Sequence, residues 1–78
     1  MNELDLIKVK AAIELAVGGK AIASRVLCSE RFQVKIRWSK GSHEVEYDYS
    51  IPMFEFKFMS CNINEVVAQY FLNHIRRA

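Results

Sequence analysis

The sequence predicts a single α+β domain over residues 1–78, with helices covering one face of a three-stranded antiparallel sheet. Apolar and polar residues alternate between residues 31 and 58, and helical periodicity appears on both sides of this stretch. Two adjacent glycines separate the first helical segment from the rest. A chain of 78 residues has room for one small core and little internal volume for a substrate pocket. Its apolar fraction of 51% is sufficient for that core.

The clearest strand pattern is RFQVKIRWSKGSHEVEYDYS, residues 31–50. Apolar residues occupy every second position from Phe32 to Trp38, and the alternation resumes after a turn predicted at Lys40–Gly41. That turn places Ile36 opposite Val45 on the apolar face. On the polar face it places Arg37 opposite Glu44 and Lys35 opposite Glu46. The sequence therefore predicts a hairpin with one apolar face and one face of paired charges.

The segment FEFKF, residues 54–58, alternates in the same way and is predicted to be the third strand. A turn over residues 50–53 would precede it, because Pro52 cannot donate a hydrogen bond to a ladder. The three phenylalanines would then lie on the core side, and Lys57 would lie beside Glu46 on the charged face. The expected sheet is a meander whose strongly aromatic face is buried by helices.

A C-terminal helix is predicted over NINEVVAQYFLNHIRRA, residues 62–78. Asn62 can cap it, and Glu65 stands three residues later, as in a capping box. Apolar residues follow at helical spacing, and Arg76 and Arg77 fall in the last turn, where cations suit the helix dipole.

An N-terminal helix is predicted to break at Gly18–Gly19. Its apolar residues fall on two nearly opposite sides, so the helix needs two apolar neighbours. One neighbour would be the sheet or the final helix, and the other either the segment after the glycines or a second copy of the chain. Residues 20–30 are expected to form a short helix or an irregular turn, with a strand beginning at RVLC as the alternative. The candidate face for homodimerisation is Leu6, Val9, Ile13 and Val17.

The glycine pair also raises the question of a phosphate-binding loop. A P-loop has the pattern GxxxxGKS or GxxxxGKT, and VGGKA lacks both the first glycine spacing and the hydroxyl after the lysine. A dinucleotide-binding turn follows a strand, whereas the preceding segment here is predicted to be helical. The pattern therefore indicates the end of a helix at Gly18.

The sequence offers no catalytic or metal-binding constellation, so we expect no enzyme activity, no cofactor and no metal. His43 would lie opposite Trp38 near the hairpin turn, and His74 is expected to pack or to cap the last helix. The order Cys28, His43, Cys61, His74 lacks the short paired spacings of structural zinc sites. Two cysteines are too few for a disulfide scaffold, which favours reduced thiols, with a single Cys28–Cys61 bridge as the alternative.

Nucleic-acid binding is the alternative function. The order helix, three strands, helix is also that of double-stranded-RNA-binding domains. The lysine cluster that opens their final helix is replaced here by SCNINE, and the net charge is only +2. RRM-type stacking would need aromatic residues on the exposed face of the sheet. The candidate residues for this alternative are Lys35, Arg37, Lys40, Arg76 and Arg77.

The favoured function is non-catalytic protein binding by a small regulator or inhibitor that occupies the surface of a partner. A sheet face with charges of both signs suits specific electrostatic pairing. Compact proteins of this kind are common in phages and mobile elements, including inhibitors of host defence, which favours such an origin by association. The opening MNELD does not resemble a secretory signal, so we expect a soluble cytoplasmic protein, in the host cytoplasm if phage-encoded. The candidate contact residues are Lys35, Arg37, Glu44, Glu46, Asp48 and Lys57.

Overall fold

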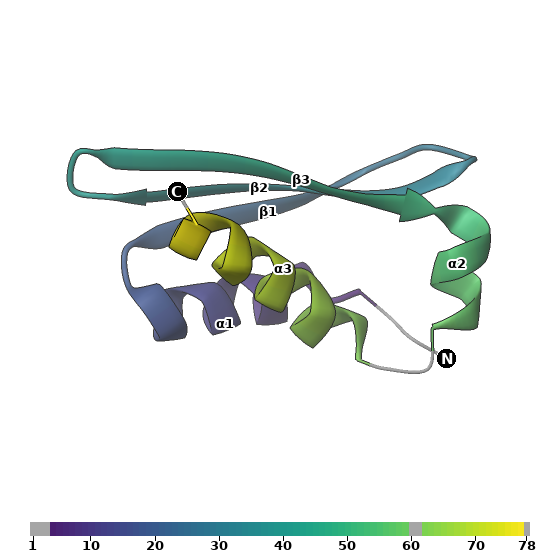
Figure 1. Ribbon diagram of the computed structural model, residues 1–78, viewed down its shortest axis with the longest axis horizontal. Helices are drawn as coiled ribbons and strands as arrows, with labels where there is room; N and C mark the ends of the chain where they lie inside the picture. Colours follow the sequence, from purple (N-terminus) through teal and green to yellow (C-terminus); the bar gives the residue numbers. More distant parts are fainter. Residues whose placement is uncertain (1–3, 60–61, 78) are drawn as a thin grey trace.

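The computed structural model describes residues 4–59 and 62–77 as a three-stranded antiparallel sheet with the long helices on one face (Figure 1). The strands lie in the order β1-β2-β3, so β2 is central and β1 and β3 form the two edges. The predicted α+β class is confirmed, including the helix that ends at the glycines, the antiparallel meander and the C-terminal helix. The elements are α1 (Leu6–Val17), β1 (Lys20–Val26), β2 (Arg31–Lys40), β3 (His43–Pro52), α2 (Met53–Phe58) and α3 (Ile63–Arg77).

One strand of the sheet is not the strand that the sequence predicts. Residues 20–26 form β1, so the expectation of a short helix or irregular turn there is wrong. The inner-face positions of β1 are Ala21, Ala23 and Arg25, which lie opposite Trp38, Ile36 and Val34. None of the three is a large apolar residue, so β1 lacks the alternation that marks the other strands.

The predicted third strand, residues 54–58, is instead the short helix α2. Strand β3 continues through Pro52, and the Met53 N–H donates to the Glu30 carbonyl at 2.9 Å, where the chain leaves the sheet. Only Phe56 turns inward, and its ring stacks on Phe32 with centroids 4.1 Å apart. Phe54 and Phe58, expected in the core, are 64% and 85% exposed.

The hairpin of β2 and β3 is confirmed, but its register differs from the predicted one by two residues. The loop is Gly41–Ser42, so Lys40 pairs with His43, which does not lie opposite Trp38. Gly41 has φ 61°, as the first position of a type II′ turn requires. A two-residue shift keeps every side chain on its face. The pairs become Ile36 with Tyr47, Arg37 with Glu46, and Lys35 with Asp48.

The core lies between the inner face of the sheet and helices α1 and α3. Fully burying one large aliphatic or aromatic side chain contributes about 1.5–3 kcal/mol to stability. The large side chains that are fully buried come from α1, β2 and α3, and they are Val9, Ile13, Phe32, Val34, Ile36, Ile63, Val67 and Phe71.

The helix stripe predicted as a dimer face belongs to this core. Val9 and Ile13 have no exposed area, and Leu6 and Val17 pack against the same cluster. The prediction of an exposed dimer face on these residues is therefore wrong, because β1 and α3 of the same chain cover the stripe. The opposite side of α1 is the exposed one, with Leu15 90% exposed.

A chain of hydrogen bonds joins the starts of the two long helices. The Asn62 side-chain oxygen accepts from the Asn64 N–H at 3.0 Å, which confirms the predicted cap. The buried Asn64 side chain accepts from the Asp5 N–H at 2.6 Å. Asp5 in turn caps α1 by accepting from the Ile7 N–H at 3.0 Å. These bonds fix the position of α3 relative to α1 beneath the sheet.

Candidate functional site

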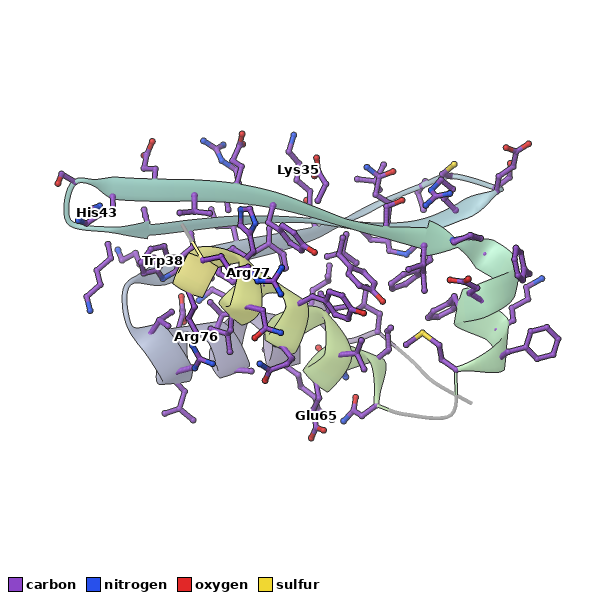
Figure 2. The ribbon with its side chains drawn as sticks, viewed as in Figure 1. Lys35, Trp38, His43, Glu65, Arg76 and Arg77 are labelled. Carbon is purple, nitrogen blue, oxygen red and sulfur yellow. The ribbon has the colours of Figure 1, made fainter. Side chains whose placement is uncertain are left out.

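The sheet face opposite the helices carries charged side chains of both signs, and we call it the outer face (Figure 2). Arg37 and Glu46 form an ion pair across β2 and β3, with 3.1 Å between Nε and Oε1. Their side chains are 64% and 60% exposed, so this pair contributes at most about 1 kcal/mol. Five of the six predicted contact residues are brought together here, namely Lys35, Arg37, Glu44, Glu46 and Asp48.

Lys57 does not join this group. Its predicted position beside Glu46 depended on a strand at residues 54–58, and that segment is helix α2. Lys57 lies in the last turn of α2, beyond the end of β3.

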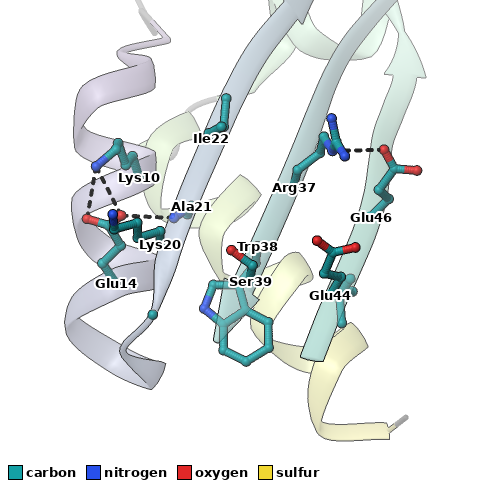
Figure 3. A pocket seen from close by; sticks show the side chains of 12 residues that line it. Lys10, Glu14, Lys20, Ala21, Ile22, Arg37, Trp38, Ser39, Glu44 and Glu46 are labelled. Atoms are coloured by element: carbon teal, nitrogen blue, oxygen red, sulfur yellow. Dashed lines mark hydrogen bonds and ion pairs between the residues drawn. The ribbon is translucent and has the colours of Figure 1, made fainter. Parts of the chain in front are cut away.

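An open groove of about 1030 Å³ crosses the outer face from α1 to β3 (Figure 3). Lys10 and Glu14 of α1 form one side, and Ile22, Arg37 and Glu46 lie across the strands. The sequence did not reveal the contributions of Glu14 and Ile22, since these depend on residues 20–26 forming a strand beside α1.

Glu14 joins α1 to the edge of the sheet. Its carboxylate accepts from the Ala21 N–H at 2.8 Å and pairs with Lys10 Nζ at 3.0 Å. The hydrogen bond from Ala21, and after it the one from Lys10, holds the pKa of Glu14 below its ordinary value. The carboxylate therefore stays ionised at neutral pH and occupies a backbone donor of β1.

The glycine pair forms the joint between α1 and β1. Gly18 has φ 73°, and its N–H donates to the Glu14 carbonyl at 2.8 Å, so the predicted helix end is confirmed. The Trp38 indole donates to the Gly18 carbonyl at 2.7 Å. Gly19 has φ 74°, and a Cβ there would lie 2.4 Å from the Ser39 carbonyl oxygen. The hydrogen bonds at this joint are therefore made by groups of the protein itself, including the carboxylate of Glu14.

Aromatic side chains lie beneath β3 on the inner face. The Tyr47 ring lies 4.8 Å from the His74 ring, and the Tyr49 ring lies 5.2 Å from the half-exposed Tyr70 ring. Desolvation, and to a lesser extent Tyr70, raises the pKa of Tyr47. His74 thus packs against an aromatic ring, which is one of the two roles expected for it.

The five cations named for nucleic-acid binding do not gather on one surface. Lys35 points outward from the sheet, whereas Arg76 and Arg77 lie on α3 beneath it (Figure 2). Arg37, two residues after Lys35 on β2, lies on the same outer face. Lys40 Nζ donates to the Val17 carbonyl at 3.2 Å, at the end of α1. The sequence could not separate these groups, because their distribution depends on which face α3 covers.

Cys28 is an exposed free thiol, and Cys61 lies outside the described residues, as does the alternative of a bridge between them. Within residues 4–59 and 62–77, no three His, Cys, Asp or Glu side chains cluster closely enough to hold a metal ion. No helix in the described part of the chain is long and apolar enough to span a bilayer. Comparisons with protein-family models, curated proteins and solved structures each found no match.

Proposed function

We propose that this chain is a non-catalytic protein-binding module, a small regulator or inhibitor that acts by occupying the surface of a partner protein. The observation that carries the proposal is the outer face, where two adjacent strands present cations and carboxylates in fixed register. Positive and negative side chains at fixed positions favour a partner surface with the complementary charge pattern and disfavour one with like charges opposite them.

The acidic row on β3 is the best candidate for the contact. Glu44, Glu46 and Asp48 are exposed and alternate along the strand, so their carboxylates point to the same side of the sheet. Glu46 is engaged by Arg37. Within residues 4–59 and 62–77, neither Glu44 nor Asp48 has an ion-pair partner. These two carboxylates are therefore available to a partner without the loss of an internal ion pair.

The experiment is a pull-down from cell lysate with the double variant Glu44→Lys, Asp48→Lys. We expect it to lose the partner that the natural chain captures, with an unchanged circular dichroism spectrum. The matched control is Glu55→Lys, Glu65→Lys, which makes the same change in net charge on helices α2 and α3. Equal capture by the two double variants would contradict the proposal.

Nuclease treatment of the lysate distinguishes the nucleic-acid alternative. Protein binding through the outer face predicts the same capture before and after nuclease. Nucleic-acid binding predicts that capture disappears after nuclease and falls steeply as salt is added.

A further inference from the structure

The β3 edge of the sheet has backbone groups that face away from β2. In a two-residue hairpin loop the flanking residues, here Lys40 and His43, form a hydrogen-bonded pair. Hydrogen-bonded and non-hydrogen-bonded pairs alternate along an antiparallel ladder, so the odd-numbered residues of β3, from His43 onward, bond to β2. The N–H and C=O groups of Glu44, Glu46, Asp48 and Ser50 therefore point outward, away from the sheet.

Two other observations agree with this parity. Pro52, which has no N–H, occupies an outward position, as proline on an edge strand does. On the other side of β2, Ala21 lies opposite Trp38. Trp38 pairs with Val45, an odd-numbered residue, so the backbone groups of Trp38 bond to β3 and not to β1. The Ala21 N–H accordingly donates to Glu14 and not to β2.

The side chains along the β3 edge form two rows of different chemistry. On the outer face the row is acidic, with Glu44, Glu46 and Asp48. On the inner face the row is apolar and aromatic, with Val45, Tyr47 and Tyr49, and the half-exposed Tyr70 ring of α3 lies 5.2 Å from the Tyr49 ring. A strand that paired with β3 would place its own side chains directly opposite these two rows.

We infer that the free edge of β3 binds an extended peptide segment with lysine or arginine at every second position and apolar residues between them. The inference rests on the proposed function and specifies how the partner binds. The outward N–H and C=O groups form the ladder with the peptide, its basic side chains pair with the acidic row, and its apolar side chains contact the inner row.

A second copy of β3 does not suit this edge. Two β3 strands paired antiparallel would place carboxylates of Glu44, Glu46 and Asp48 opposite or diagonal to one another, which destabilises cross-strand pairs. A basic strand satisfies the same backbone groups with attraction in place of repulsion. Charge complementarity therefore selects a basic peptide as the occupant.

The experiment uses a heptapeptide of alternating lysine and valine with blocked ends as the probe for the full chain. Titration followed by NMR should show that the amides of Glu44, Glu46 and Asp48 become protected from hydrogen exchange on binding. The amides of Val45 and Tyr47 already bond to β2, so their protection should change little. Absence of binding up to about 1 mM probe would overturn the inference, as would binding without protection of the edge amides.

A matched pair of variants separates the ladder from simple charge attraction. Asp48→Ala and Asp48→Pro remove the same carboxylate, but only the proline removes an outward N–H. We expect Asp48→Pro to bind the probe about tenfold more weakly than Asp48→Ala, because a ladder bond is lost and the ring obstructs the neighbouring strand. Equal affinities would mean that the carboxylates attract the peptide without strand pairing.

A modified probe gives the same test without altering the protein, should Asp48→Pro fail to fold. N-methylation of the peptide amides that face the edge removes the donors and keeps all charges. Binding should then be lost, and retained binding would overturn the inference. Edge binding of the probe with no partner captured from lysate would remove the proposed function alone. Capture that depends on Glu44 and Asp48, without edge protection, would remove this inference alone.

Discussion

The two edge strands of the sheet differ in what meets their outward backbone groups. Beside β1 lies helix α1, and the Glu14 carboxylate accepts from the Ala21 N–H at 2.8 Å (Figure 3). Along β3 the exposed acidic side chains of Glu44, Glu46 and Asp48 stand beside the outward groups. Edge strands tend to pair with other chains, and both arrangements restrict such pairing. The Glu14 bond removes one backbone donor from any strand that would pair with β1, whereas the acidic row on β3 disfavours only an acidic strand.

Gly19→Ala is expected to have the largest effect on the occupied side. A Cβ at Gly19 would lie 2.4 Å from the Ser39 carbonyl oxygen and 2.9 Å from the Trp38 indole nitrogen. Together with the positive φ, this should lower the free energy of unfolding by about 2–4 kcal/mol in denaturant titration. The control is Gly41→Ala, also at positive φ but with open space around it, which should lower it by about 1–2 kcal/mol. Equal losses would show that the close approach at Gly19 is unimportant.

Trp38→Phe is expected to have a smaller effect on the same joint. It removes the hydrogen bond from the indole to the Gly18 carbonyl, and the free energy of unfolding should fall by about 1–2 kcal/mol. Lys40→Met removes a more exposed bond, to the neighbouring Val17 carbonyl, and should lower it less. A greater loss for Lys40→Met would show that the joint depends mainly on the lysine.

Glu14→Gln is expected to have an effect that depends on pH. The folded state lowers the pKa of Glu14 from its ordinary value of 4.5, so its contribution to stability is present above that pH. This contribution is lost as the pH falls through the lowered pKa, where the carboxylate takes up a proton in the folded state. Glutamine still offers an oxygen to Ala21 but cannot titrate. Acid unfolding followed by circular dichroism should therefore depend less on pH in the variant.

Glu44→Gln makes the same change in charge on the open side. Within the described residues Glu44 has no ion-pair partner. The free energy of unfolding of the variant at pH 7 should therefore stay within about 0.5 kcal/mol of the value for the natural chain. If Glu44→Gln lowers the free energy of unfolding as much as Glu14→Gln does, the proposed difference between the two edges is wrong.

The hairpin and the final helix could be predicted from the sequence because both have strong periodicity. Alternation assigned residues 32–38 and 44–49 to the correct faces, and Asn62 marked the start of α3, whereas residues 50–52 of β3 were expected to form a turn. The exact register could not be predicted, since a shift by two residues preserves both the faces and the pairing of base with acid. The turn geometry at Gly41 decided it.

The local sequence pattern could not show which segment of the chain forms the third strand. FEFKF alternates like a strand, yet Phe56 can stack on Phe32 from a helix, and the Met53–Glu30 bond turns the chain out of the sheet. Residues 20–26 form a strand because of tertiary contacts with α1 and β2, which small inner-face alanines permit. The grouping of the five candidate contact residues of β2 and β3 on one face could be predicted, because alternation assigned them to that face.

The bond between Glu14 and Ala21 also limits how copies of this protein can assemble. Head-to-tail growth of a fibre by strand addition requires two complementary open edges on every molecule. A strand that paired with β1 at Ala21 would have to displace the Glu14 carboxylate from the Ala21 N–H. If a partner strand adds at β3 as inferred above, the bond at Ala21 disfavours further growth through the β1 edge of the same molecule. A single carboxylate near the end of α1 is thus expected to disfavour polymerisation through this edge.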